Sequence, residues 1–130
     1  MLSELKVTTH RREEVVDVTA EVRAAVRKSG VGEGTCLVFS PHTTCGVAVN
    51  ENADPAVGQD LQQHLAEVVP RLRTWQHQEG NSDAHIKAVL VGPSVTLPVL
   101  GTDLKLGRWQ GVFLCEFDGP RERNLWVVVG

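Results

Sequence analysis

The sequence predicts an α+β fold with a mostly antiparallel, β-sandwich-like core and two or three helices. Strand-like segments dominate the chain, and the helical segments are inserted between them without strict alternation. The last strand-like segment also reaches Val129, which places the C-terminus in a sheet. A doubly wound parallel sheet would require regular alternation of strands and helices. With 130 residues, of which 42% are hydrophobic, the chain fits a single domain over 1–130.

The N-terminal third is predicted to contain two strands and a helix. Residues 2–9 and 13–18 alternate weakly between apolar and polar side chains, around a turn at 10–12. Thr19 is expected to cap a helix through Ser29, which glycines then end. The apolar face of this helix consists of Val22, Ala25 and Val26.

The middle of the chain predicts two further strands and an amphipathic helix. Residues 35–39 and 45–50 are β-rich. The pair Asp54-Pro55 is a helix start, because Asp can cap the helix and Pro is tolerated at its first position. The helix is expected to end at Pro70, and its apolar face consists of Val57, Leu61, Leu65 and Val68.

The C-terminal part predicts a connection, a short helix and three strands. Residues 71–79 form an irregular connection, and Asn81 or Ser82 caps a helix through about Leu90. The strands are expected at 95–100, 109–117 and 124–129.

Composition excludes several classes of function. The formal net charge of −3 argues against general nucleic-acid binding, which requires many Lys and Arg on phosphates. The first residues do not resemble a signal peptide, and no run approaches the roughly 20 apolar residues that span a bilayer. We therefore expect a cytoplasmic protein without membrane or nucleic-acid partners. The three cysteines lack zinc or redox spacing and are expected to be buried thiols.

Three of the five histidines lie among acids, amides and hydroxyls, and they suggest one polar site. His42 ends a hydrophobic run and precedes Thr43 and Thr44. A returning strand is expected to bring Glu51 back close to His42. Buried ionisable groups need a partner or a role, which favours a functional reading of this pair.

His77 and His85 flank a polar loop and form a second candidate block. If the helix starts at Asn81 or Ser82, His85 lies in its first turn, where the positive helix end keeps imidazole neutral and suited to a metal. The spacing is a loose one for zinc. The alternative is a capping histidine, with Lys87 on a solvated face.

The third block lies near the C-terminus. Arg121 and Arg123 are two residues apart on an expected strand, so both project to one face and suit a phosphate clamp. Cross-strand pairing with Glu116 or Asp118 is the alternative. Gln110 is expected at the wall of a pocket.

These blocks together resemble the YjbQ family, often described as secondary thiamine-phosphate synthase. The similarity covers nearly the whole chain in order and is most specific from about Thr35 to the end. Its motifs are His42-Thr43-Thr44, Asn50 to Pro55, Asn81 with Ala84 to Lys87, Leu106 to Gln110, and Glu116 to Arg123. The resemblance implies a small α+β fold assembled as a homotrimer. It also implies a histidine-containing pocket and an activity that joins a pyrimidine methyl diphosphate to a thiazole phosphate, releasing pyrophosphate.

The leading hypothesis is accordingly a transferase acting on a small phosphorylated substrate. We expect Arg121 and Arg123, with Lys87, to bind phosphate, and Thr43, Thr44, Asn81 and Gln110 to contact the substrate. His42, His77 and His85 would bind zinc or magnesium or donate protons, and Glu51 would orient a histidine or act as base. Two alternatives stay open: a metal-dependent hydrolase or lyase, and a non-catalytic trimer that binds a phosphorylated metabolite.

Overall fold

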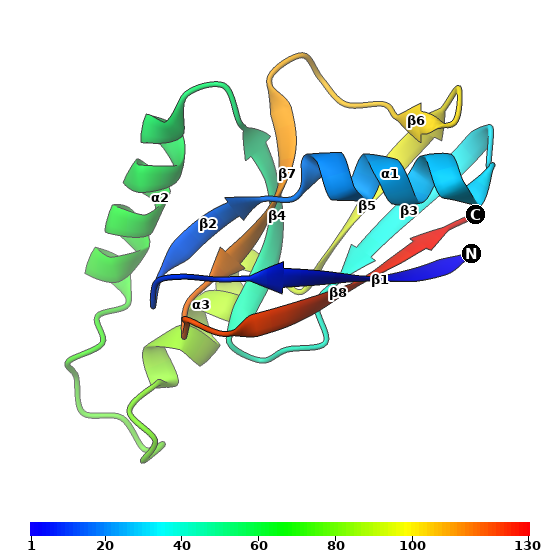
Figure 1. The fold of residues 1–130 in the computed structure, drawn as a ribbon. Helices are drawn as coiled ribbons and strands as arrows, with labels where there is room; N and C mark the ends of the chain where they lie inside the picture. Colours follow the sequence, from blue (N-terminus) through cyan, green and yellow to red (C-terminus); the bar gives the residue numbers. More distant parts are fainter.

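The computed structural model describes residues 1–130 (Figure 1). Eight strands and three helices follow one another along the chain. In order they are β1 (Leu2–Thr8), β2 (Glu14–Asp17), α1 (Thr19–Ser29), β3 (Glu33–Phe39), β4 (Cys45–Glu51), α2 (Pro55–Val68), α3 (Ser82–Val91), β5 (Ser94–Leu100), β6 (Asp103–Leu104), β7 (Gln110–Glu116) and β8 (Glu122–Val129). None of the helices is long and apolar enough to cross a membrane.

The strands form two antiparallel sheets. The larger, sheet A, has the order β1-β8-β3-β5-β6, and the smaller, sheet B, has the order β2-β7-β4. The predicted α+β class with an antiparallel core is therefore confirmed, and the two sheets form a curled half-barrel. The C-terminal strand β8 lies between β1 and β3, so the expected role of the C-terminus in a sheet is also confirmed.

The main core lies between the two sheets and α1. Alternate residues of β3, β7 and β8 point into it because successive side chains of a strand face opposite sides. Helix α1 adds its predicted apolar face, and Val22, Ala25 and Val26 are all buried. Thr19 is the first residue of α1 and does not cap it; its hydroxyl donates to Asp17 and accepts from the backbone N–H of Val112.

The other face of sheet B carries α2 and α3 (Figure 1). Cys115 and Phe117 pack there against Ala84 and Ala88 of α3 in a small second cluster. Helix α2 begins as predicted, since the Asp54 carboxylate accepts a hydrogen bond from the N–H of Ala56 at 2.9 Å. No residue of α2 is buried, although its apolar face has the expected spacing. Its contact with the sheet is thus incomplete.

Helix α3 buries two charged residues beside its two core alanines and leaves two apolar residues exposed. Asp83 and Lys87 are fully buried, at 0% and 1% exposure, whereas Val89 is 80% and Leu90 59% exposed. The hydrophobic effect alone would not bury the two charged side chains while these apolar ones stay in water. Ion pairs with Arg12 and Glu13, in the loop between β1 and β2, explain why Asp83 and Lys87 are buried.

Some segments differ from the prediction. Strands β1 and β2 flank the expected turn but do not pair with each other: β1 pairs with β8 and β2 with β7. The short strand β6, which pairs with the end of β5, has no periodicity from which it could have been predicted. The three cysteines are buried free thiols, and burial raises the pKa of Cys36 to about 11 and that of Cys115 to about 12.

Candidate functional site

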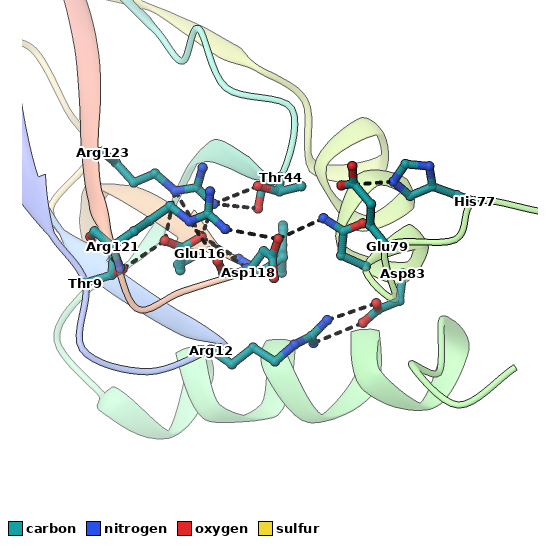
Figure 2. Close-up of polar contacts among 12 residues, drawn as sticks. Thr9, Arg12, Thr44, His77, Glu79, Asp83, Glu116, Asp118, Arg121 and Arg123 are labelled. Atoms are coloured by element: carbon teal, nitrogen blue, oxygen red, sulfur yellow. Dashed lines mark hydrogen bonds and ion pairs between the residues drawn. The ribbon is translucent and has the colours of Figure 1, made fainter. Parts of the chain in front are cut away.

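A buried ion pair joins the two sheets at one corner (Figure 2). The guanidinium of Arg123, at the start of β8, donates to both carboxylate oxygens of Glu116, at the end of β7; Nε lies 2.9 Å from Oε1. Arg123 also donates to the Thr44 hydroxyl at 2.8 Å, and the Thr9 hydroxyl donates to Glu116 at 2.8 Å. Four strand ends from β1, β4, β7 and β8 therefore meet at one charge-neutral cluster.

This arrangement corrects the expected phosphate clamp. Arg121 precedes β8 and is not on the strand face of Arg123. Arg121 donates to the carboxylate of Asp118 at 3.2 Å and stays half-exposed, whereas Arg123 is 1% exposed and binds Glu116 and Thr44 through Nε and Nη2. The structure shows the alternative arrangement, in which Arg123 pairs with Glu116 and Arg121 pairs with Asp118. Arg121 is thus the guanidinium that a ligand can reach.

His42 lies beside this cluster. Its Nε2 accepts a hydrogen bond from the backbone N–H of Asn124 at 2.9 Å, so the neutral ring carries its proton on Nδ1. Burial, together with the charge of Arg123, holds the pKa of His42 below its usual value. A neutral imidazole with a donor at Nδ1 suits a hydrogen bond to an anionic oxygen.

Two amide oxygens near these residues are buried without a donor: Oδ1 of Asn81 and Oδ1 of Asn124. Asn81 precedes α3, and its Nδ2 donates to Asp118 at 2.9 Å, which joins it to Arg121. Buried acceptors are nearly always satisfied. Asn81 and Asn124 are the two exceptions here, and both belong to the hydrogen-bond network that also contains Asp118, Arg121 and His42.

Lys87 does not lie on a solvated face. Its ammonium donates to Glu13 at 2.7 Å and to Asp83 at 3.2 Å. Arg12 binds the Asp83 carboxylate through two nitrogens (Figure 2). Burial would raise the pKa of Asp83, but the hydrogen bonds from Arg12 and Lys87 outweigh it and hold that pKa below its usual value. The charge of Lys87 is therefore neutralised within the chain, and these pairs attach α3 to the loop between β1 and β2.

His77 and His85 come together as expected. Their rings meet edge to face, with centroids 5.2 Å apart, and Nε2 of His77 lies 3.4 Å from the carboxylate of Glu79. His85 belongs to the first turns of α3, as the sequence predicted. Both rings line a shallow pocket beside that helix.

The three histidines do not form a metal site within one subunit. No group of three or more His, Cys, Asp and Glu side chains is arranged to hold a metal ion. The Nε2 of His42 accepts a hydrogen bond from Asn124, whereas the rings of His77 and His85 contact each other. A metal bound by this pair would require further ligands from another molecule.

Glu51 and Gln110 lie at the opposite end of sheet B from His42. In the register of β4 and β7, Cys45 faces Glu116 and Glu51 faces Gln110. Seven strand residues span about 20 Å, so the expected approach of Glu51 to His42 is wrong. Glu51 instead lines a cavity of about 410 Å³ between α2 and sheet B. Gln110 is exposed and accepts from the N–H of Gly107 at 2.8 Å.

Of the remaining candidates, Thr43 is exposed and Thr44 is buried against Arg123. Sequence reasoning missed several residues that the structure places in or beside the site: Thr9, Arg12, Glu13, Asp83 and Asn124. Their contacts connect residues 70 or more positions apart, which no local spacing reveals.

Comparison with known proteins identifies relatives over the whole chain. The family described as "UPF0047 protein YjbQ-like" matches residues 3–130. A UPF0047 protein of Methanocaldococcus jannaschii is 44% identical over 99% of this chain and 94% of its own. The UPF0047 protein YugU of Bacillus subtilis is 42% identical over 98% of this chain and 97% of its own.

Solved structures agree with these relatives. An uncharacterised YjbQ/UPF0047 family protein of Clostridium acetobutylicum superposes with a TM-score of 0.97 at 44% identity, covering 98% of this chain and 99% of the other. A YbjQ-like protein of unknown function from Sulfolobus solfataricus gives 0.95 at 35% identity, covering 99% and 95%. Sequence and fold agree over nearly the full length, and the chain belongs to the YjbQ (UPF0047) family.

Proposed function

We propose that this protein is a thiamine-phosphate synthase-like transferase that joins a hydroxymethylpyrimidine diphosphate to a thiazole phosphate. The reaction forms a bond between the thiazole nitrogen and the pyrimidine methyl carbon, breaks the bond from that carbon to oxygen, and releases pyrophosphate. The observation that carries the proposal is the half-exposed guanidinium of Arg121, held by Asp118, beside a neutral His42 imidazole in the same corner of the fold. A reachable guanidinium and an imidazole N–H suit the phosphate oxygens of such a substrate.

In this proposal Arg121 and His42 act on the leaving group. Arg121 is held by Asp118 but half-exposed, so it can neutralise charge as pyrophosphate departs. The Nδ1–H of His42 donates a hydrogen bond to a phosphate oxygen. Arg123 takes no direct part, because its guanidinium is bound to Glu116 and Thr44; its positive charge adds to burial in lowering the pKa of His42.

A divalent metal and a homotrimer belong to the same proposal. Zinc or magnesium would need donors from a second subunit beside His77 and His85, since one subunit lacks a complete ligand set. The exposed apolar residues of α3 support assembly, because Val89 and Leu90 are largely exposed on a helix that buries two charged residues. Large exposed apolar surfaces on soluble proteins mark interaction sites.

The test is turnover of the two thiamine precursors by tag-free protein, with and without added Mg²⁺ or Zn²⁺. We expect Arg121→Ala and His42→Ala to lower kcat by about a hundredfold, with partial retention in Arg121→Lys. Arg27→Ala, which removes an exposed arginine from α1, is the matched control and should leave kcat unchanged. No turnover by the wild type under any metal condition would reject the proposal.

The internal pairing of Arg123 and Lys87 favours a second candidate, a trimer that binds a phosphorylated metabolite without reacting. Of the two arginines, Arg121 alone is then exposed enough to neutralise charge in a transition state. A thermal shift with phosphorylated ligands but no turnover would support this candidate, since a ligand that binds the folded state stabilises it.

A further inference from the structure

The cavity between α2 and sheet B is large enough for a ligand. Its volume of about 410 Å³ is within the usual range for small-molecule sites. Sixteen residues line it, from β2, β4, β7, α2 and the adjoining loops. Helix α2 comes close to β2 at Gly58, where an added Cβ would lie 3.8 Å from Val15. No residue of the helix is buried, so α2 leaves space over the rest of the sheet.

The floor of this cavity is apolar. Phe113 belongs to β7, the central strand of sheet B, and Val15 and Ala48 line the cavity from the strands on either side. All three side chains are only half-buried, although α2 lies over this face of the sheet (Figure 1). Apolar surface that a helix leaves uncovered inside a cavity can be covered by the apolar body of a ligand.

The rim of the cavity is acidic. It contains one basic residue, Arg11, and four carboxylates, those of Glu14, Asp17, Glu51 and Asp54. None of the four forms an ion pair, with Arg11 or with any other basic residue. Three of them accept a hydrogen bond from a nearby backbone N–H, whereas the half-buried carboxylate of Glu51 accepts none. Charges of one sign around a cavity attract a ligand of the opposite sign.

We propose that this cavity binds a small amphipathic amine, with its ammonium group at Glu51 and its apolar body on Phe113. An ammonium group has three donors and no acceptor, so it matches carboxylate oxygens and the amide oxygens of Asn50 and Gln62, which also line the cavity. The site is separate from the one proposed for phosphate, because Glu51 lies at the opposite end of sheet B from His42. Its negative charge also repels phosphate.

The experiment is an NMR titration of the full chain with 2-phenylethylamine, which combines a ring with an ammonium group. Two further probes separate these parts: 2-phenylethanol keeps the ring without the charge, and 3-phenylpropionate reverses the charge. We expect the amine to bind more tightly than the alcohol, the propionate not to bind, and the shifted amides to lie around the cavity. Glu51→Gln should weaken amine binding by roughly threefold to tenfold and leave the alcohol unchanged.

Matched variants test the carboxylate and the cavity separately. Glu33→Gln removes an exposed, unpaired carboxylate from β3 in sheet A and should bind the amine as the wild type does. Gln59→Lys places an ammonium group at an exposed position of α2 that lines the cavity, so it should compete with the amine. Gln63→Lys makes the same change at an exposed position of α2 outside the cavity and should have no effect.

The outcomes separate this site from the proposed transferase. Equal affinities for the amine and the alcohol would overturn the inference, as would equal amine binding by wild type and Glu51→Gln. Displacement of the amine by pyrophosphate would also overturn it, because the two sites would then be one. Amine binding that depends on Glu51 and is unaffected by pyrophosphate supports the cavity site, whether or not the protein turns over the thiamine precursors.

Discussion

Arg123 and Glu116 form an ion pair that is almost completely removed from water, at 1% and 0% exposure. The pair connects the end of sheet B to the start of β8 in sheet A. A buried charge that loses its partner is strongly destabilising. We therefore expect Arg123→Met or Glu116→Gln to lower the free energy of unfolding by about 3–5 kcal/mol in urea titrations. Arg121→Ala, which breaks a half-exposed pair, should cost less than about 1 kcal/mol. Equal losses for the two arginines would contradict this account.

Acid should destabilise the fold through Glu116 and Asp83. Burial would raise the pKa of each carboxyl, but hydrogen bonds, chiefly from Arg123 to Glu116 and from Arg12 to Asp83, leave both pKa values below the usual range. A carboxyl with a lowered folded-state pKa stabilises the fold at pH values above its unfolded pKa of about 4, and this stability is lost as the pH falls through the folded value. Urea unfolding from pH 7 to pH 3 should show the loss below about pH 5. Asp83→Asn, less stable at pH 7, should show a shallower pH dependence.

His42 should be neutral at pH 7, with its proton on Nδ1. Burial and the charge of Arg123 lower its pKa, and Nε2 accepts from Asn124. Long-range ¹⁵N–¹H NMR should identify the Nδ1–H tautomer and a titration midpoint below the reference value of about 6.5. Arg123→Met should raise that midpoint if the variant folds. A wild-type Nε2–H tautomer would contradict the assigned geometry.

Gly46 should be indispensable for the packing of β4 against the end of α3. A Cβ at this position would lie 2.8 Å from the carbonyl oxygen of Gly92 and 2.8 Å from Cγ1 of Val91, so the backbone would have to move. We expect Gly46→Ala to lower the melting temperature, with a loss of about 1–3 kcal/mol. Gly32→Ala is the control, because a Cβ there meets nothing within 4 Å.

The exposed apolar residues of α3 should control assembly. Leu90→Asp places a charge beside the exposed Val89 and is expected to shift the proposed trimer toward monomer, as measured by light scattering after size exclusion. Ala24→Asp, at an exposed position of α1, is the control and should leave the mass unchanged. A wild type that is already monomeric would refute the proposed trimer.

The sequence by itself determined the local elements. Asp54-Pro55 and Pro70 bracket α2, the spacing of Val22 and Val26 orients α1, and β-rich runs mark most strands. These signals act over a few residues, since caps and periodicity depend on neighbours along the chain. The sequence predicted one polar site for His42, His77 and His85, and the contact that the structure shows is the one across a single loop, between His77 and His85.

Only the tertiary structure decided how the charges are paired. Whether Arg123 faces a ligand or Glu116 depends on how β8 in sheet A meets β7 in sheet B, and Glu51 lies far from His42 because β4 runs away from that corner. The Lys87 side chain is buried because the carboxylates of Asp83 and the distant Glu13 accept its hydrogen bonds. The Asp83 carboxylate in turn also binds Arg12. A buried charge goes where its partners are, and those partners come from strand ends and loops that are brought together only when both sheets have formed.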